Sequence, residues 1–297
     1  MDHYQALKHV QEYGLIAEQV KLDGQYHNVP TIHKPHKKSG WYKYSDGRLG
    51  VGDLRTGHYQ TFTSDNKKIS TVDRKHLQQI IYKNERNKKA LQDQAANQAR
   101  QLYAQANDNA SHPYLVKKGL SDIDGLKVIN NQLLIPLYDL GTGLIRNLQR
   151  IYPDGTKRFL KDGQITGLAC SVGLPEFDEH TPEKMKWPYI CEGFATAATV
   201  HHFTGQPAFS AMTAGNLLAV SKIVRKRWPD ADIVIAGDDD WLTFQQHGVN
   251  PGKEKAIEAA NAINAQVSFP PFKPEQRQAG LSDWNDYWLN AGRKDND

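Results

Sequence analysis

The residues of this chain most capable of chemistry are carboxylates from three segments that lie far apart in the sequence. They are Glu192, the triplet Asp238-Asp239-Asp240, and the pair Asp283 and Asp286. The first two groups each follow a short apolar run, 188–191 and 232–236, where catalytic residues gather beyond the ends of parallel strands. Crowded carboxylates repel one another unless a cation joins them. Because Mg²⁺ and Mn²⁺ prefer such oxygen ligands and leave positions for substrate phosphates, the pattern predicts phosphoryl or nucleotidyl transfer at a divalent metal.

Each acidic segment also has a plainer interpretation. Glu192 precedes a glycine and a helix-forming run, so it either binds metal, acts as a base, or is a solvent-facing residue favoured by the helix dipole. In an extended segment residues i and i+2 point the same way, so Asp238 and Asp240 can share a metal while Asp239 points aside. For Asp283, a helix N-cap is the alternative to a metal role. Taken together, the three groups favour a metal site.

Other phosphate and metal motifs fit this sequence poorly. A phosphatase of the DxDxT type would need threonine at position 242, which is Leu242. A glycosyltransferase DxD motif would leave Glu192 unexplained. Neither GxxxxGKS nor GxxxxGKT occurs, so a P-loop is excluded. Residues 250–253, Asn-Pro-Gly-Lys, indicate the start of a helix, from which Lys253 could approach a phosphate.

The segment that must position these carboxylates alternates between strand and helix patterns. The expected strands are 188–191, 207–211, 232–236 and 266–269, and the expected helices are 195–203, 216–227 and 252–264. Alternation of this kind predicts a parallel sheet covered by helices. The carboxyl ends of its strands would then carry Glu192 and the aspartate triplet.

The first half of the chain differs in character. Turn-forming glycines and short aromatic runs in residues 1–65 predict a small β unit after a short N-terminal helix. Residues 71–107 contain neither glycine nor proline and predict a long polar helix that serves as a spacer or a clamp. Its thin apolar stripe consists of Leu77, Ile80, Ile81, Leu91, Ala95 and Leu102. After Pro113, short strands are expected at 132–138, 144–152 and 157–160.

These patterns divide the chain into four parts. They are a β-rich unit at 1–65, a polar helical linker at 66–112, a basic subdomain at 113–180 and a catalytic domain at 181–297. The length of 297 residues, 39% of them apolar, suffices for two domains or for one large domain with an appendage. No apolar stretch approaches the roughly 20 residues that cross a bilayer and no signal-peptide core occurs, so we expect a cytosolic protein without a membrane partner. Cys170 and Cys191 lie in apolar settings typical of buried free thiols.

The net charge of +4 is modest, but the charges are unevenly distributed. Residues 34–48, 67–89 and 146–161 are basic, whereas the carboxylates concentrate after residue 176. This asymmetry indicates a polyanion that is held by one part of the protein and processed at a metal in another. For any single lysine, ordinary solvated surface is the alternative.

Several motifs resemble those of a known family. Residues 190–193, Ile-Cys-Glu-Gly, with Asp238-x-Asp240 and the following helix, resemble the Toprim domain, which bacterial-type primases, topoisomerases and some nucleases share. Further segments are similar to DnaG-like plasmid and phage primases of the TraC type and to the primase halves of phage primase–helicases: 23–30, 39–42, 114–119, 134–137, 147–149 and 153–159. The resemblance implies an α/β fold with a Toprim-like parallel sheet flanked by helices. A mixed α+β basic subdomain and a small β-rich N-terminal unit would precede it.

The resemblance also implies roles for the matching residues. The set that binds Mg²⁺ or Mn²⁺ would be Glu192, Asp238, Asp240 and Asp286, with Asp283 as the alternative to the last. Glu192 would also be the catalytic acid or base, and with Asp238 and Asp240 it would make up the catalytic set. The reaction would be that of a DNA primase, which synthesises short primers on single-stranded DNA.

Nucleic acid and nucleotide would be held by basic residues of the upstream subdomain. The candidates are Lys117, Arg146, Arg150, Lys157, Arg158 and Lys161, whose charges would neutralise phosphates. Tyr152 and Phe159 are either base-stacking residues or buried strand aromatics. The partners implied are a single-stranded DNA template, nucleoside triphosphates and a replicative helicase.

One departure from the family concerns zinc. Many primases carry an N-terminal zinc module built from cysteine and histidine, but residues 1–65 contain no cysteine. His27, His33 and His36 without cysteine would be an unusual zinc site, so we predict a metal-free β unit and no zinc. Two functions compete with the primase: a Toprim-type metal-dependent nuclease, and a nucleic-acid-binding protein that keeps the fold without catalysis.

Overall fold

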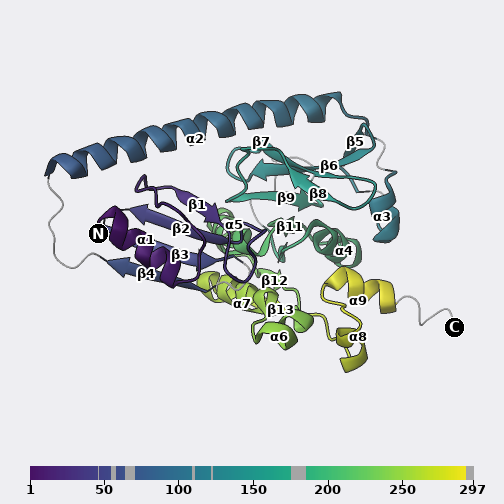
Figure 1. Cartoon of the computed structure of the whole chain (residues 1–297). Coiled ribbons are helices and arrows are strands. Elements are labelled where there is room, and N and C mark those ends of the chain that lie inside the picture. Colours follow the sequence, from purple (N-terminus) through teal and green to yellow (C-terminus); the bar gives the residue numbers. More distant parts are fainter. Residues whose placement is uncertain are drawn as a thin grey trace. The chain divides into compact units, whose positions relative to one another are not determined.

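The computed structural model describes residues 1–45, 47–54, 58–63, 71–108, 111–121, 123–174 and 185–291. The chain divides into two units, Met1–Ala90 and Leu91–Asp297. One helix, α2 (Thr71–Gln105), runs from the first unit into the second (Figure 1). The boundaries expected at residues 66 and 181, and the side chains expected in the stripe at 77, 80 and 81, lie outside the described parts.

The first unit consists of a helix and a four-stranded antiparallel sheet. The elements, in chain order, are α1 (His3–Glu12), β1 (Tyr26–Val29), β2 (Gly40–Ser45), β3 (Arg48–Asp53) and β4 (Tyr59–Thr63). One face of the sheet packs against α1 through alternate strand residues and two helix residues: Tyr42, Tyr44, Leu49, Val51, Ala6 and Val10. The predicted N-terminal helix and β-rich unit are therefore confirmed, and the other sheet face is left outside this core.

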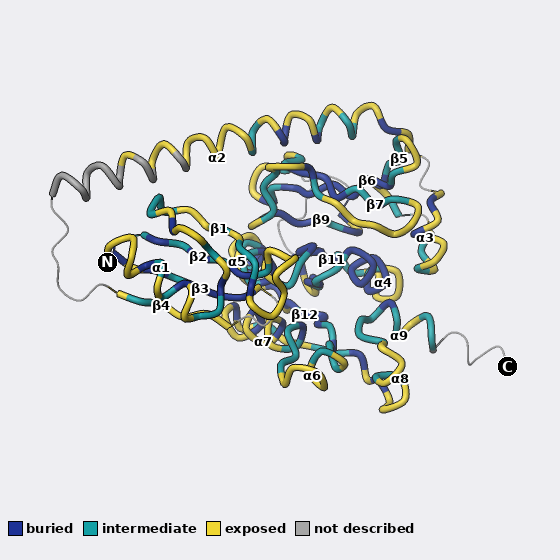
Figure 2. The backbone as a smooth tube through the Cα atoms, in the orientation of Figure 1, coloured by how far each residue is buried: buried dark blue, intermediate teal, exposed yellow. Residues whose placement is uncertain are grey.

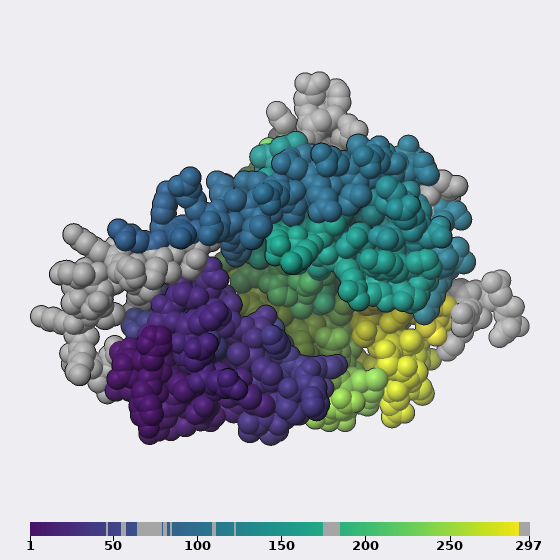
Figure 3. Space-filling view, turned by 45° about the horizontal axis from the view of Figure 1, so that its top comes forward, coloured from purple at the N-terminus to yellow at the C-terminus, as the bar shows by residue number. Residues whose placement is uncertain are grey.

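The second half of α2 packs on the second unit through small side chains. Ala95, Ala96 and Ala99 are buried, whereas Leu91, which we expected in the apolar stripe, is 45% exposed. Alanines let a helix lie close to a sheet, and Ala99 contacts a cluster that includes Leu134 and Leu148 of the strands below. Figure 3 shows this part of the helix, in blue, directly against the teal strands. Of the stripe members whose side chains are described, Ala95 was thus predicted correctly and Leu91 was not.

A single sheet runs through the described part of the second unit. Its nine strands are β5 (Lys127–Ile129), β6 (Gln132–Asp139), β7 (Ile145–Ile151), β8 (Lys157–Phe159), β9 (Leu168–Val172), β10 (Tyr189–Cys191), β11 (Ala208–Ser210), β12 (Val234–Ala236) and β13 (Gln266–Ser268). The spatial order is β13-β12-β10-β11-β9-β6-β7-β8, with β5 beside β6. The strands β13, β12, β10 and β11 are parallel, as the alternating pattern predicts. We did not predict β9, which pairs with both β11 and β6 and so joins the upstream strands to the parallel ones.

Helices cover both faces of the parallel strands. Those lying against the strands are α4 (Phe194–Thr204), α5 (Ala214–Arg227) and α7 (Pro251–Ile263). The other helices described in this unit are α3 (Pro113–Lys117), α6 (Trp241–His247), α8 (Pro274–Gln278) and α9 (Trp284–Ala291). Phe194 and Ala197 of α4 belong to the core on one face, whereas Val220 of α5 and Ala259 of α7 belong to the core on the other. In Figure 2, β9 and β11 are dark blue because they are covered on both sides. The predicted α/β architecture is confirmed.

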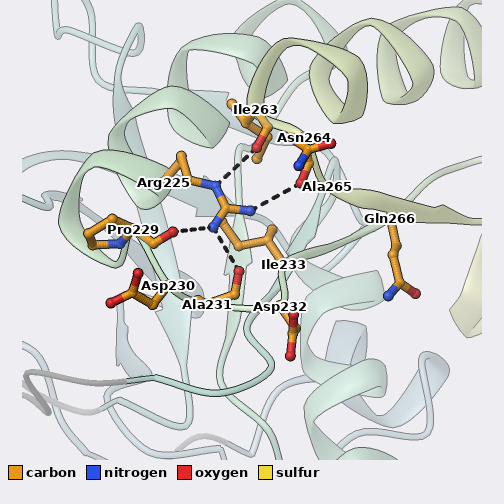
Figure 4. A pocket seen from close by; sticks show the side chains of 10 residues that line it. All are labelled: Arg225, Pro229, Asp230, Ala231, Asp232, Ile233, Ile263, Asn264, Ala265 and Gln266. Atoms are coloured by element: carbon orange, nitrogen blue, oxygen red, sulfur yellow. Dashed lines mark hydrogen bonds between the residues drawn. The ribbon is translucent and has the colours of Figure 1, made fainter.

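Arg225 closes the end of the parallel sheet at which the strands begin. Its guanidinium donates to the carbonyl oxygens of Ile263, Pro229, Ala231 and Asn264 at 2.7–3.3 Å (Figure 4). A guanidinium has five N–H donors, so these bonds occupy most of them. Arg225, near the C-terminal end of α5, is therefore hydrogen-bonded to the C-terminal end of α7.

No helix in the described ranges is both long enough and apolar enough to span a membrane. Cys170 and Cys191 are buried free thiols, as expected. Burial raises the pKa of Cys170 to about 12, so this thiol stays protonated near neutral pH.

Candidate functional site

The parallel strands bring Glu192 and Asp238 to one edge of the sheet. Glu192 directly follows β10 and Asp238 follows β12 by one glycine, and these neighbouring strands pair Cys191 with Ala236. From β10 the chain passes through α4 to β11 on one side, and then through α5 to β12 on the other side of β10. The carboxyl edge at such a reversal of strand order is where α/β proteins bind ligands.

Asp238 lies in the middle of a group of carboxylates that the sequence holds far apart. We call this group the acidic cluster: Glu192, Asp238, Asp240, Asp283 and Asp286. Burial and then the charges of the other members raise the pKa of Asp238 well above its ordinary value. Its Oδ1 atom is buried and has no hydrogen-bond partner among the described residues. An orphaned, crowded carboxylate oxygen of this kind is suited to a cation.

Glu192 is held at the start of two helices. Gly193, the residue between Glu192 and α4, has an extended backbone (φ −97°, ψ 154°) and forms the N-cap of that helix. Burial and the charge of Asp240 raise the pKa of the Glu192 carboxyl, while a hydrogen bond from the backbone of Ala214, the first residue of α5, opposes the shift. Ser210 donates to the Glu192 carbonyl oxygen at 3.1 Å and fixes the backbone.

Asp239 points away from the cluster, as the i, i+2 alternation predicts. It is fully buried, with Lys253 Nζ at 3.0 Å from one carboxylate oxygen and Arg277 Nε at 3.0 Å from the other. Burial alone would raise the pKa of Asp239, but the bonds from Lys253 and Asn250 and the charge of Arg277 bring it below the ordinary value. Lys253 is therefore engaged with Asp239, and an approach of its ammonium to a phosphate stays a prediction.

The start of α7 shapes the loop that carries the aspartates. Asn250 caps this helix, accepts from the backbone of Asp240 at 3.0 Å and donates to Asp239 at 2.9 Å. The amide of Gly252 donates to Asp240 Oδ2 at 2.9 Å. A Cβ at position 252 would lie 2.7 Å from the carbonyl oxygen of Asp238, so only glycine fits this approach. The helix start predicted at 250–253 is confirmed.

Asp283 is an N-cap residue that also lies close to other carboxylates. Its carboxylate accepts from the backbone of Asp286 at 2.7 Å, in the manner of an N-cap for α9. It also lies in the acidic cluster, since burial raises its pKa and the charge of Asp286 adds to the shift against an opposing contribution from Lys118. The N-cap interpretation of Asp283 is therefore confirmed, and its metal role stays a prediction.

Lys118 is the residue near the cluster that the sequence analysis missed. Its Nζ lies 3.4 Å from Asp286 Oδ1 and 3.9 Å from Asp283 Oδ2. Burial would lower the pKa of Lys118, but Asp283 and Asp286 outweigh it and raise the pKa. The neighbouring Lys117, which we had selected, is exposed at the end of α3. The Lys-Lys pair offered no local signal to choose between them.

The other basic candidates lie on different faces of the sheet. Directly opposed residues of antiparallel strands share a face, and Arg150 opposes Arg158 whereas Ile151 opposes Lys157. Arg146, two residues before Leu148 and four before Arg150, is on the face of Arg150, and its Nη2 lies 2.6 Å from Oδ1 of Asp93 in α2. These arginines therefore lie on the face that α2 covers.

Lys157 lies on the opposite face, near the cluster. Lys157 is an exposed residue whose Nζ lies 5.0 Å from the centre of the Tyr114 ring, and partial desolvation of its ammonium followed by the charge of Lys118 lowers its pKa. Phe159 packs against the core on this face and Tyr152 is half-buried. Lys161 is exposed in the turn after β8. Of the basic candidates in the strands, Lys157 is thus the one placed beside the acidic cluster.

The acidic cluster has the type of ligand atoms that a divalent ion needs, but its side chains are not arranged as a complete coordination site. In the described ranges, no three His, Cys, Asp or Glu side chains converge closely enough to form a finished metal site. The carboxylate oxygens are nevertheless the donor type that Mg²⁺ and Mn²⁺ prefer, and the buried Oδ1 of Asp238 lacks a partner there. In the first unit, His27 is one of the three histidines considered above for a zinc site. Its Nε2 lies 2.7 Å from Oδ1 of Asp23.

Comparison with known proteins gives the class of this chain. Residues 188–294 match the family model described as the Toprim domain. The chain is 32% identical over 269 residues to a DNA primase TraC of Escherichia coli, which covers 85% of this chain and 24% of the relative. A second DNA primase TraC of Escherichia coli is 32% identical over 266 residues, covering 86% of this chain and 18% of the relative. The chain thus spans a quarter or less of the length of these relatives.

Two solved structures are similar over part of the chain. The primase fragment of the bacteriophage T7 primase–helicase is 16% identical, with a TM-score of 0.39, and covers 56% of this chain and 62% of that one. The DnaG primase catalytic domain bound to single-stranded DNA is 12% identical, with a TM-score of 0.40, and covers 68% of this chain and 86% of that one.

The acidic cluster belongs to a Toprim domain formed by residues 188–294. More narrowly, the chain is a Toprim-domain relative of DNA primase TraC, with the similarity extending well upstream of that domain. The family resemblance drawn from the motifs is confirmed.

Proposed function

We propose that this chain is the primer-synthesising part of a DNA primase, acting on single-stranded DNA by divalent-metal-dependent nucleotidyl transfer. The observation that supports it most strongly is the acidic cluster around Asp238, at the carboxyl edge of a Toprim sheet. The similarity to DNA primase TraC over 85% of the chain supports the reaction class. The proposed partners are the template, nucleoside triphosphates and, by family resemblance, a replicative helicase.

In this proposal, each acidic residue has a distinct task. Glu192, Asp238 and Asp240, with Asp286 or Asp283, would hold Mg²⁺ or Mn²⁺, which would activate the attacking hydroxyl and neutralise charge on the phosphates. Glu192, which directly follows β10 beside the aspartates, would accept the proton of that hydroxyl as the general base. Asp239 would keep the loop in place through its ion pairs.

The basic residues beside the cluster would receive the nucleotide. Lys118 and Lys157 lie on the α4 side of the sheet with Tyr114, so they would face the triphosphate when it enters. Arg146, Arg150 and Arg158 lie on the other face, so a role for them would be in holding template away from the reacting atoms. Lys117 and Lys161 are exposed and would add only to the surrounding positive charge.

Incubation with single-stranded DNA, nucleoside triphosphates and Mg²⁺ or Mn²⁺ tests the proposal. Short oligomers should form with the wild type, and Asp238→Asn and Glu192→Gln should abolish them. The matched control is Glu258→Gln, an exposed carboxylate paired with Lys255 on the surface of α7, which should retain activity. Oligomers at wild-type level with Asp238→Asn would refute the catalytic site.

The same variants distinguish the two competing functions. A Toprim nuclease would cut a labelled strand with metal alone, without nucleoside triphosphates, and Asp238→Asn would stop the cutting. A protein that only binds nucleic acid would form no oligomers and cut no strand, and Asp238→Asn would leave its binding unchanged.

A further inference from the structure

The outer face of the N-terminal sheet carries aromatic and basic side chains that the proposed function does not use. Strand residues alternate between the core and this face, and the strand register fixes which residues share it. The residues facing outward are Tyr26, Asn28, Trp41, Lys43, Ser45, Arg48, Gly50, Gly52, Tyr59, Thr61 and Thr63. Among these described strand positions none is acidic.

This face is hollowed and its aromatic rings are open to solvent. A shallow pocket of about 660 Å³ is lined by residues of all four strands, including Trp41, Lys43 and Arg48. Tyr26 is 65% exposed and Tyr59 is 70% exposed, although tyrosine is a residue that core packing would readily use. The same sheet buries Tyr42 and Tyr44 on its inner side. The unit therefore has a core that accepts tyrosine rings, and Tyr26 and Tyr59 nevertheless lie outside it.

Two glycines hold the ring of Trp41 against the sheet. A Cβ at Gly52 would lie 2.6 Å from Cε2 and Nε1 of Trp41, and a Cβ at Gly50 would lie 3.3 Å from its Cζ3. The indole therefore lies across β3, over a strip that has no side chains. Tyr26 meets it edge-on, with ring centroids 5.2 Å apart. The result is a fixed platform of ring surface and not a set of freely rotating side chains.

Positive charge borders the platform. Lys43 Nζ lies 4.8 Å from the centre of the Tyr26 ring, and Arg48 is exposed at the start of β3. Flat rings bordered by cations, on strand positions that include no described carboxylate, complement a ligand that has both π faces and negative charge. Single-stranded nucleic acid has this chemistry, since its bases stack on aromatic rings while its phosphates pair with lysine and arginine. A duplex hides its base faces and fits less well.

We propose that the outer face of β1–β4 binds single-stranded nucleic acid, with bases stacked on Trp41, Tyr26 and Tyr59 and phosphates near Lys43 and Arg48. The rings stand on β1, β2 and β4, which three strand spacings separate by roughly 14 Å. That distance has room for two or three bases. The inference rests on the proposed function only for the identity of the strand as a DNA template.

Fluorescence anisotropy of a labelled oligothymidylate with the full chain tests this inference. EDTA is present and nucleotides are omitted, so that the catalytic site contributes no metal-dependent binding. The variants are Trp41→Ala with Tyr59→Ala, and Gly52→Ala, which keeps every aromatic residue but displaces the indole. The control is Tyr4→Ala, which removes a ring that is 78% exposed on α1, away from this face. Thermal melting monitors folding, and Tyr59→Ala alone serves if the double variant melts early.

The double variant should bind about tenfold more weakly or worse, because stacking is lost at two positions. Gly52→Ala should also lose affinity, Tyr4→Ala should match the wild type, and the wild type should prefer single-stranded to duplex DNA. Equal binding of the oligonucleotide by the wild type and the face variants would overturn the inference. A changed melting temperature without changed binding would also overturn it, because it would indicate that this face packs against protein. Asp238→Asn should bind the oligothymidylate with wild-type affinity while losing primer synthesis. This variant therefore distinguishes a failure of the proposed catalytic site from a failure of the proposed binding face.

Discussion

Asp238 and Asp239 are neighbours in the chain but lie in opposite electrostatic surroundings. Asp239 is buried between Lys253 and Arg277, each at 3.0 Å, and its pKa is lowered. Asp238 has carboxylates around it, a buried oxygen without a partner in the described structure, and a raised pKa. One aspartate therefore anchors the loop that presents the other. Proteins often place such an unfavourable group at a functional site and stabilise it from adjacent residues.

Removing the charge of Asp238 should stabilise the protein. A raised pKa means that the folded state holds the proton more tightly than the unfolded chain, so stability is lost as pH rises above the ordinary value of 3.8. Asp238→Asn should thus raise the free energy of unfolding at pH 7 by about 0.5–2 kcal/mol. Urea denaturation at pH 7 and in mild acid measures it, and the gain should shrink as pH falls. An equal or lower stability at pH 7 would contradict the assignment of Asp238 to a repulsive cluster.

The same substitution at the next residue should do the reverse. Asp239→Asn would leave Lys253 and Arg277 without their carboxylate and should destabilise the protein by about 2 kcal/mol. This is below the roughly 3–5 kcal/mol of a fully buried pair, because these side chains are 32% and 31% exposed. Since the pKa of Asp239 is lowered, its stabilising effect is present above the ordinary value of 3.8 and is lost as pH falls through the folded-state pKa. Urea denaturation that shows no loss at pH 7 would contradict this.

Lys118 and Lys117 are adjacent lysines, one beside the acidic cluster and one exposed, so substitutions of the two can be compared directly. Lys118→Met removes the cation that lies 3.4 Å from Asp286, so kcat/KM for primer synthesis should fall about tenfold or more. Lys117→Met removes an exposed charge of the same size and should change the rate by less than about twofold. Initial rates under saturating template provide the comparison. Equal effects of the two changes would mean that Lys118 acts only through net charge.

Lys157 and Arg158 separate the two faces of the upstream strands. Lys157→Ala should raise the KM for nucleoside triphosphate, because Lys157 lies beside Tyr114 on the face of the acidic cluster. Arg158→Ala should leave that KM unchanged, because Arg158 shares with Arg150 the face that α2 covers. Titration of nucleotide at fixed template measures both values. A larger effect from Arg158→Ala would place the nucleotide on the other face.

The parts of the site that local patterns determine could be predicted from sequence. The apolar runs before Glu192 and Asp238 form adjacent parallel strands, and the period of two along an extended chain separates Asp239 from its neighbours. The upstream elements depend more on tertiary contacts. The short strand β9 has no strong pattern of its own and is fixed by pairing on both sides. The choice of Lys118 over Lys117 depends on where α9 places Asp283 and Asp286.

The long helix shows the same limit on a larger scale. Its helical nature follows from the absence of glycine and proline, but its contact face does not follow from hydrophobicity. Ala95 and Ala99 are buried while Leu91 is exposed, since close approach to the strands favours small side chains. The pattern of large apolar residues therefore gave the wrong orientation at one position.

Calorimetric titration of Mn²⁺ into the full chain tests the central claim most directly, because it needs neither template nor catalysis. Mn²⁺ should bind saturably to the wild type and to Glu258→Gln, and at least about tenfold more weakly to Asp238→Asn and to Glu192→Gln. Binding of equal strength by all four proteins, or none by the wild type, would contradict the claim that the acidic cluster is a divalent metal site.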